Sequence, residues 1–286
     1  MADEEPINWK EAAQELGRGF TRGILRSIAD WFRGRDQEAS KSSDPGRGIL
    51  ILGPGGTGKT TFARLLSGDL DWLSDTPGQY IESVGLESFA LSDDPNVEVV
   101  VAPGQAYRRA STWSDLLKQV AAGEYRGVVL MNAYGYHTFS TPSYKNHQLY
   151  QGSKDDFLRD YYADRRADEI RVLKQLAPHL SICSKRVWLL SIVAKQDLWG
   201  SQQRQVEEHY VRGDYATEIH DIAQKLGHQL FRPEVVFLSL IIRNLETIAN
   251  ERLQATEEGY DMRRVLDSLR TLITVVAGLK HWEDER

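Results

Sequence analysis

Cysteine is almost absent from the 286 residues: the single one, Cys183, excludes an internal disulfide and a metal site built from several thiolates. The seven histidines show no metal-ligand spacing, so protein side chains alone are not expected to hold a metal. Positive charge is also in deficit, because the formal net charge is −6. This charge argues against a general electrostatic attraction to nucleic acid, and we expect no nucleic-acid partner.

Long hydrophobic runs and targeting signals are missing as well. The apolar runs "GILIL" and "GVVLM" are far too short to span a bilayer. The acidic start "MADEEP" lacks the basic residues of a secretory signal, and neither myristoylation nor prenylation is encoded. With 41% hydrophobic and 27% charged residues, the composition is that of an ordinary soluble globular protein. We expect a cytoplasmic protein with one large domain and extensions, or with a small second domain.

The first 47 residues predict a helix and a linker. Apolar residues three or four apart predict an amphipathic helix over residues 7–32, within an N-terminal segment 1–32. The polar, serine-rich residues 33–47 read as a linker. The helix could make peripheral contact with a membrane surface, or dock on its own domain or on a partner protein. Its mixed charge favours docking.

Alternating strand and helix patterns predict an α/β fold over residues 48–240. Five apolar runs have the length and composition of buried strands, namely 48–53, 97–102, 127–132, 186–194 and 234–240. Helical patterns separate them, notably at 112–122, 156–177 and 203–226. This order predicts a doubly wound, mainly parallel sheet covered on both faces. Two more helices, at 241–256 and 260–280, are expected to form a C-terminal helical extension over residues 241–286.

A phosphate-binding loop follows the first predicted strand. The stretch "GPGGTGKT" fits the pattern G-x-x-x-x-G-K-[ST] at every constrained position. Its glycines let backbone N–H groups point at anionic oxygens, and the helix that follows adds its positive dipole end. Lys59 is expected to bridge the β- and γ-phosphates, and Thr60 to offer its hydroxyl to Mg²⁺. The predicted nucleotide-binding residues here are Gly53, Gly55, Gly56, Thr57, Gly58, Lys59, Thr60 and Thr61.

The letters PGQ occur twice, in "DTPGQ" at 75–79 and in "VAPGQ" at 101–105. In a P-loop fold, the γ-phosphate sensor follows the strand beside the phosphate-loop strand. The second copy follows the apolar run "VEVVV", whereas no strand precedes the first copy. We therefore predict that the second copy meets the phosphates, and that the first is a turn.

These motifs resemble the Ras-like small GTPases, and most of all their Arf-like branch, over about residues 49–240. The stretch "YIESVGLE" at 80–87 resembles the first switch, and "PGQAYRRASTW" at 103–113 resembles the second. "ADEIRVLKQL" at 167–176, followed by "VWLLSIVAKQDLW", resembles the helix and strand that lead to the guanine-specificity motif. That motif is 194–197 in this chain.

The resemblance implies roles for single residues. At the phosphate end, Gly104 would donate its backbone N–H to the γ-phosphate and Gln105 would orient the attacking water. Ser83 would join Thr60 on Mg²⁺. At the base end, Asp197 would accept hydrogen bonds from guanine, Lys195 would lie along the base, and Ser239 would fall in the last base-binding loop. Partner proteins, either effectors or regulators, would bind the switch regions and the helical extensions.

Two positions depart from the family pattern. Val101 stands where an acid normally holds Mg²⁺ through water, and Ala194 stands where an asparagine braces the base loop against the phosphate loop. Glu98 cannot replace the acid, because an offset of three places it on the opposite face of the strand. Three functions therefore remain open: a GTP-binding switch with slow hydrolysis, a pseudo-GTPase scaffold that binds nucleotide without turnover, and another P-loop ATPase or nucleotide kinase.

The arginines and aromatics near the motifs allow further hypotheses. Four arginines at 159, 165, 166 and 171 could form a lid over phosphates, but a solvated helix with i,i+4 ion pairs is favoured. Arg108 and Arg109 are expected to face solvent or a partner rather than to act as an internal arginine finger. The aromatic insertion at 133–162 predicts an ordered loop that packs on the domain or meets a partner. Its histidines, His137 and His147, are expected at the surface.

Overall fold

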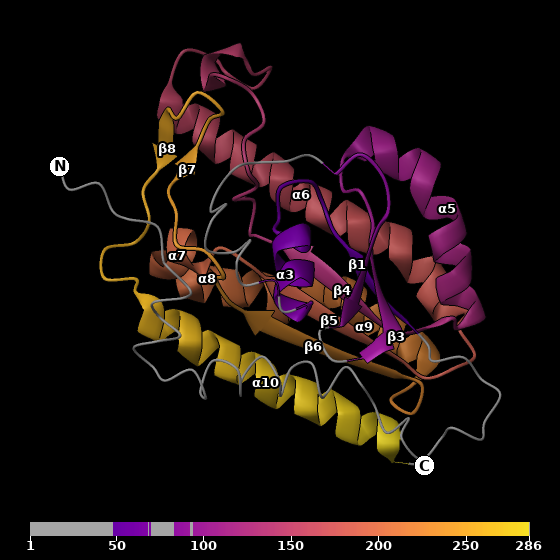
Figure 1. The fold of residues 1–286 in the computed structure, drawn as a ribbon. Helices are drawn as coiled ribbons and strands as arrows, with labels where there is room; N and C mark the ends of the chain where they lie inside the picture. The colour runs from indigo at the N-terminus through magenta and orange to yellow at the C-terminus, as the bar shows by residue number, and fades with distance from the viewer. Residues whose placement is uncertain (1–47, 68, 70–82, 92–93, 286) are drawn as a thin grey trace.

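A six-stranded, mainly parallel sheet forms the centre of the protein in the computed structural model, which describes residues 48–67, 69, 83–91 and 94–285 (Figure 1). The strand order is β2-β3-β1-β4-β5-β6. The predicted N-terminal helix, the linker and the first PGQ copy lie outside the described residues. The strands are β1 (Gly48–Leu52), β2 (Glu87–Leu91), β3 (Asp94–Val101), β4 (Tyr125–Asn132), β5 (Val187–Val193) and β6 (Phe231–Phe237).

Five of these strands were predicted, and the sixth, β2, was not. It is a short edge strand that pairs antiparallel with β3, whereas the other neighbouring pairs are parallel. An edge strand has little need of a continuous apolar run, because one of its sides faces no other strand. Its sequence therefore carries a weak strand signal.

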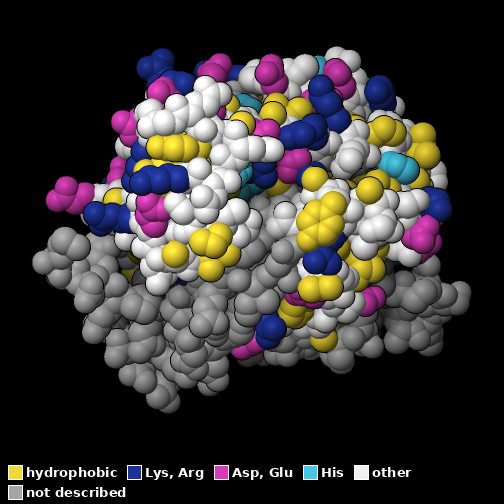
Figure 2. All heavy atoms as spheres, turned by 90° about the horizontal axis from the view of Figure 1, so that it is seen from above, with side chains coloured by type: hydrophobic (Ala, Val, Ile, Leu, Met, Phe, Trp, Pro, Cys, Tyr) yellow, Lys and Arg dark blue, Asp and Glu magenta, His cyan; other side chains and the backbone are white. Residues whose placement is uncertain are grey.

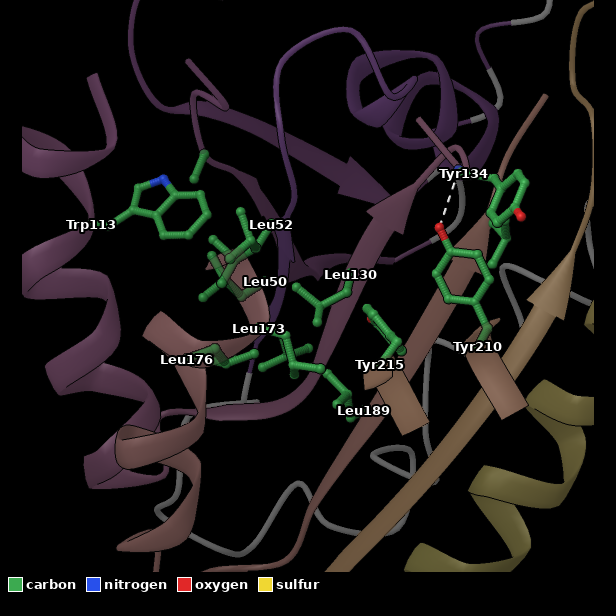
Figure 3. Close-up of a cluster of buried hydrophobic side chains, with 14 of the residues drawn as sticks. Leu50, Leu52, Trp113, Leu130, Tyr134, Leu173, Leu176, Leu189, Tyr210 and Tyr215 are labelled. Carbon is green, nitrogen blue, oxygen red and sulfur yellow. Dashed lines mark hydrogen bonds between the residues drawn. The ribbon is translucent and has the colours of Figure 1, made fainter. Parts of the chain in front are cut away.

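Helices cover both faces of the sheet, which confirms the predicted doubly wound fold. Successive side chains of a strand point to opposite faces, and in β1 Ile49 and Ile51 join one core cluster while Leu50 and Leu52 join the other. α3 (Lys59–Leu66) and α10 (Met262–Asp284) cover the first face. The second face carries α5 (Ala106–Ala122), α6 (Lys154–Ser181) and α9 (Asp214–Leu226). Figure 3 shows part of this second core, where Leu50 and Leu130 lie near Leu173 of α6.

The two last helical predictions have different outcomes. The helix expected at 260–280 is confirmed as α10, which begins after Asp261 caps the backbone N–H groups of Arg263 and Arg264. The helix expected at 241–256 is wrong, because the chain forms a hairpin of β7 (Leu245–Glu246) and β8 (Arg252–Gln254). Asn250 turns the hairpin with a φ of 62°, and hydrogen bonds between Thr247 and the turn residues use the backbone groups that a helix would need.

The helix expected at 203–226 is divided into shorter elements. α7 (Gln196–Trp199) and a 3-10 turn, η2 (Gly200–Gln202), lead into α8 (Gln203–Glu207). A π-helical turn, η3 (Glu208–Arg212), follows α8, and α9 begins only after Gly213, whose backbone is extended. The apolar periodicity continues across this break, which is why the sequence suggested one helix.

The aromatic insertion packs on its own domain. Phe139 contacts Phe157 edge to face with ring centroids 5.7 Å apart, and Tyr144, in the 3-10 turn η1 (Tyr144–Asn146), stacks on Phe157 at 5.5 Å. Its last residues form the first turns of α6. The expectation of a surface His137 is wrong: this side chain is 1% exposed, and its Nε2 lies 2.8 Å from Glu169 Oε1. Glu169, also buried, accepts hydrogen bonds from the backbone N–H groups of Ala133 and Gly135 and so anchors the start of the insertion.

Among the described residues, none of the helices combines the length and the apolar character that a membrane span requires.

Candidate functional site

The phosphate loop joins β1 to α3 at the carboxyl edge of the sheet. Gly53 has a φ of 143°, and a Cβ there would collide with the backbone oxygen of Met131. The Thr57 hydroxyl donates to the Pro54 carbonyl at 3.0 Å and closes the turn inside the protein. Because α3 begins at Lys59, its first backbone N–H groups have no helical partners and face the loop. The loop can therefore hold an anion.

Lys59 lies folded into this loop. Its Nζ donates to the carbonyl oxygens of Gly53 at 3.0 Å and Pro54 at 2.7 Å, and the residue is 6% exposed. Burial, aided by the charge of Arg109 and opposed by Glu87 and Asp168, lowers the pKa of Lys59 to about 7. A phosphate beside Nζ would favour the charged ammonium again.

The second PGQ copy lies against the phosphate loop, in the place predicted for it. A Cβ on Gly104 would come 2.5 Å from the Gly53 carbonyl oxygen and would collide with Lys59 Nζ, so only glycine permits this approach. The Gln105 side chain lies beside Gly55, where a Cβ would come 2.5 Å from its Nε2. The indole Nε1 of Trp113 donates to the Pro103 carbonyl at 3.0 Å and holds the loop at the start of α5.

The two predicted metal ligands also meet. Thr60 Oγ1 lies 3.3 Å from Ser83 Oγ, and it donates to Glu87 Oε2 at 3.4 Å. These are oxygen ligands, the kind that Mg²⁺ prefers. The described residues contain no group of three or more His, Cys, Asp or Glu side chains that could hold a metal. A Mg²⁺ ion in this corner would therefore be coordinated partly by these protein oxygens and partly by phosphate oxygens, the usual arrangement for this ion.

The base end of the site is built on the loops after β5 and β6. Asp197 is 1% exposed and accepts hydrogen bonds from the Ser239 hydroxyl and, at 3.0 Å, from the Arg243 backbone N–H. Burial raises the pKa of Asp197 to about 6, and these hydrogen bonds and the charge of Lys195 oppose the rise. The fold thus brings together the three residues predicted at the base end, Lys195, Asp197 and Ser239.

Thr138, which the sequence did not single out, joins the base loop to the phosphate loop. Its backbone N–H and its hydroxyl both donate to the Gly56 carbonyl, at 3.0 and 3.2 Å. The Thr138 hydroxyl also accepts from Lys195 Nζ at 3.0 Å. The chain has Ala194 where the resembled family has an asparagine, and Thr138 connects the two loops at this place.

One cavity of about 650 Å³ connects the two ends, a volume that suits a small-molecule ligand. The hairpin that replaced the predicted helix forms part of its wall, through residues 244–248 and 250. This hairpin is bonded to the insertion, since the Ile248 N–H donates to the Thr141 carbonyl at 3.2 Å and the Ser143 hydroxyl donates to Glu251 at 3.2 Å. The sequence did not predict that the hairpin and the insertion belong to the site, because neither segment carries a motif.

Arg108 and Arg109 have different surroundings. Arg109 is 5% exposed, and its Nη2 contacts both carboxylate oxygens of Asp168 on α6, at 2.6 and 2.7 Å. The expectation that it faces solvent or a partner is wrong. Arg108 is half-buried, and its Nη1 donates to the Val84 carbonyl at 2.9 Å and ties α5 to the segment that precedes β2.

Three of the four arginines of α6, Arg159, Arg165 and Arg171, form surface ion pairs, as the favoured hypothesis expected, while Arg166 lies over the Tyr134 ring. Arg159 pairs with Asp156 at 2.6 Å, while Arg165 pairs with its neighbour Asp164. The expected i,i+4 spacing is wrong: these pairs are i,i+3 or adjacent, and Arg171 also contacts Asp164, seven residues away, at 3.7 Å. Figure 2 shows basic and acidic side chains interspersed over the described part of the upper face. Arg165 also lines a small recess beside Gly55 and Gln105.

Comparisons with known proteins do not assign a family. No protein-family model matches the chain. A curated relative, the ATP-dependent zinc metalloprotease FtsH 2 of Symbiobacterium thermophilum, is 30% identical over 101 residues, which are 35% of this chain and 14% of the protease. The chain thus spans a small part of the length of that relative.

Three solved structures align with the fold at low scores. The Arf-like small COPII coat GTPase Sar1 of Encephalitozoon cuniculi, in complex with GDP, is 14% identical, with 96% of this chain and 97% of that chain covered and a TM-score of 0.37. The GDP-bound signal recognition particle receptor SRb of Chaetomium thermophilum is 14% identical over 79% of this chain and 96% of its own, with a TM-score of 0.38. NFeoB of S. thermophilus with GDP and AlF4⁻ is 11% identical over 82% and 64%, with a TM-score of 0.38. Likeness at this level carries no argument about the present chain.

Proposed function

We propose that the protein is a guanine-nucleotide-binding switch of the Arf-like type that uses Mg²⁺ and hydrolyses GTP slowly. One observation carries the proposal. A single cavity has the phosphate loop with Gly104 and Gln105 at one end, and the buried carboxylate of Asp197 at the other. The first group suits a triphosphate and the second suits a guanine base.

The phosphate end supports an in-line attack of water on the γ-phosphate. Gln105 would orient the water, because its side chain lies over the loop beside Gly55. The Lys59 ammonium and the loop N–H groups would stabilise the negative charge of the transition state. Mg²⁺, when bound, would neutralise charge on the β- and γ-phosphate oxygens. Thr60 and Ser83 would hold that ion.

The base end supports discrimination between guanine and adenine. Guanine presents N1–H and an exocyclic amine to a carboxylate, whereas adenine has no such donor pair. An ionised carboxylate offers about four acceptor sites. Asp197 shows three protein donors, the Ser239 hydroxyl and the backbone N–H groups of Arg243 and of Asp197 itself, and so keeps acceptor capacity for a base. With adenine bound, the buried charge would lack those partners, and binding would weaken.

The switch regions support a role in partner binding. Arg108 bonds Val84, so the second-switch helix and the first switch are mechanically connected. A γ-phosphate that orders one region would therefore bias the other. Val84, Leu86 and Tyr107 are exposed by 73%, 51% and 67% and would offer apolar contacts to an effector or regulator protein. Contact with a membrane through the N-terminal helix, and a cytoplasmic location, remain predictions from the sequence.

Two other functions have some support. The word "ATP-dependent" in the name of the FtsH relative, together with Ala194 in place of asparagine, favours an ATP-using P-loop enzyme. Val101 in place of the acid favours a scaffold that binds nucleotide without turnover.

Single-turnover hydrolysis of GTP and of ATP separates the three functions. Wild type is compared with Gln105→Ala. We expect slow GTP hydrolysis in wild type, a loss of about 10- to 100-fold in the variant, and no ATP hydrolysis. Hydrolysis of ATP in preference to GTP would reject the role of Asp197. Tight GTP binding without hydrolysis would favour the scaffold that binds nucleotide without turnover.

A further inference from the structure

The missing acid at Val101 has a counterpart on the neighbouring strand. In the antiparallel pair of β2 and β3, Glu87 lies directly opposite Val101. Residues directly opposite each other in such a pair project from the same face of the sheet, with Cβ atoms about 5 Å apart. The side chain of Glu87 therefore leaves the sheet on the face from which an acid at position 101 would project.

The contacts of Glu87 show where its carboxylate ends. Oε2 accepts from the Thr60 hydroxyl at 3.4 Å, and Thr60 in turn lies 3.3 Å from Ser83. All three residues line the large cavity. Val101 is fully buried and brings no oxygen. Glutamate is longer than aspartate by one methylene group, so it can reach the same corner from the strand farther from the phosphate loop.

Glu98, the other acid on these strands with a described side chain, has different surroundings. It is exposed and pairs in register with Ala90. Burial, with the added charges of Glu98 and Glu124, raises the pKa of Tyr125 to about 12. The charge of Glu98 is therefore felt by Tyr125, away from the metal corner. By contrast, the charge of Glu87 acts on Lys59. Glu98 therefore serves as a matched control.

We propose that Glu87 supplies the anionic anchor for Mg²⁺ that Val101 cannot supply, next to the hydroxyls of Thr60 and Ser83. It is a positioning residue that would accept hydrogen bonds from the water molecules of the hydrated ion. The inference depends on the proposed function, since it requires a nucleotide–Mg²⁺ complex. In this protein the acid lies at the start of β2, opposite the end of β3 where the resembled family has it.

The test measures the Mg²⁺ dependence of nucleotide binding rather than turnover. The full chain is titrated with a fluorescent GDP analogue over a series of Mg²⁺ concentrations and in excess EDTA. Loss of an outer ligand of a metal typically weakens metal affinity by 10- to 100-fold. In Glu87→Gln we therefore expect the Mg²⁺ concentration at half-maximal effect to rise by at least about 10-fold. Binding in EDTA should change by less than about twofold, because only the metal anchor is lost.

Two further variants sharpen this result. Glu98→Gln should leave the Mg²⁺ midpoint where it is in wild type. Val101→Asp in the Glu87→Gln background should restore most of the lost Mg²⁺ affinity, because it returns an acid to the same sheet face. If this double variant does not fold, the comparison of Glu87→Gln with Glu98→Gln still decides the question.

Three outcomes would count against the proposal. Equal midpoints in wild type and Glu87→Gln would overturn it. Equal weakening of binding with and without Mg²⁺ would also overturn it, because Glu87 would then only support the fold of the site. Wild-type protein that binds no guanine nucleotide would instead reject the proposed function itself, and this result differs from the other two.

Discussion

The Thr138 hydroxyl accepts a hydrogen bond from Lys195 Nζ at 3.0 Å and donates one to the Gly56 carbonyl at 3.2 Å. Through this one side chain, the base loop and the phosphate loop are connected although the chain has Ala194 where the resembled family has an asparagine. The connection comes from the insertion, which otherwise packs as an aromatic cluster on the domain.

Replacement of Thr138 by valine tests this connection. The shape is kept, but Lys195 loses an acceptor. A hydrogen bond to a charged group is worth about 1.5–3 kcal/mol, so we expect nucleotide affinity to fall by about 10-fold or more. Equilibrium binding of labelled GDP measures the effect. Thr274→Val, at an exposed position of α10, is the control and should bind like wild type.

Gly104→Ala should disable the γ-phosphate end of the site. The added Cβ would collide with Lys59 Nζ and lie 2.5 Å from the Gly53 carbonyl, so the two loops must move apart. We expect GTP hydrolysis to fall by at least about 100-fold, as for the loss of a transition-state contact. Gly278→Ala, in α10 where a Cβ meets nothing within 4 Å, should keep activity and raise stability by about 0.5–1 kcal/mol. Undiminished hydrolysis in Gly104→Ala would contradict the assigned role.

Guanine affinity should fall in acid because Asp197 must be ionised to accept hydrogen bonds from the base. Burial raises the pKa of Asp197 to about 6, so in the empty site the carboxylate is progressively protonated as the pH falls through 6. Below that value, each pH unit should weaken GDP binding by up to about tenfold, or 1.4 kcal/mol.

The matched variant for this pH profile is Asp197→Asn. Ionisation of the phosphates is common to both proteins, so the ratio of their GDP affinities from pH 5 to 8 isolates Asp197. We expect the affinity of wild type divided by that of the variant to fall below pH 6. The variant should also gain a preference for xanthosine nucleotides. A ratio independent of pH would argue that Asp197 does not bind the base.

The hairpin over the cavity should slow nucleotide release. Asn250 turns it with a φ of 62°, which glycine adopts freely and valine does not. Asn250→Gly and Asn250→Val both lose the amide, so their difference reports on the backbone alone. We expect faster release of labelled GDP in Asn250→Val than in Asn250→Gly, by about 5-fold for each 1 kcal/mol of strain at the turn. Equal rates would mean that the hairpin does not hold the nucleotide.

The Arg109–Asp168 pair should matter more for stability than any surface pair on α6. Arg109→Ala would leave the buried Asp168 carboxylate with only its longer contact to Arg171, at 3.6 Å. Loss of one member of a buried pair costs about 3–5 kcal/mol, and we expect a cost at the lower end of this range. Urea unfolding followed by circular dichroism measures this change. Arg159→Ala, which breaks an exposed ion pair, should unfold at nearly the same urea concentration as wild type.

The sequence alone was sufficient for those features that contiguous residues encode. The glycine spacing and the lysine of "GPGGTGKT" specify the turn and the start of α3, because left-handed φ angles and a helix dipole are local properties. Apolar runs likewise specified five strands of the sheet, and the position of Gln105 after one of them correctly predicted that the second PGQ copy lies at the loop. The same local reasoning was wrong for the β7–β8 hairpin, whose helical periodicity is outweighed by a turn at Asn250 and a contact with Thr141.

Tertiary structure decided how the two departures from the family pattern are accommodated. Thr138 meets Gly56 across 82 positions of the chain, and Glu87 meets Thr60 across 27. Neither contact has a signal in sequence spacing, because strand register and loop packing depend on how distant segments fit together. The resemblance led us to expect an acid at position 101 and an asparagine at position 194, where the chain has Val101 and Ala194. Only the folded chain could show that Glu87 lies opposite Val101, and that Thr138 connects the two loops where Ala194 cannot. Both depend on which faces of the sheet and of the insertion are turned toward the phosphate loop.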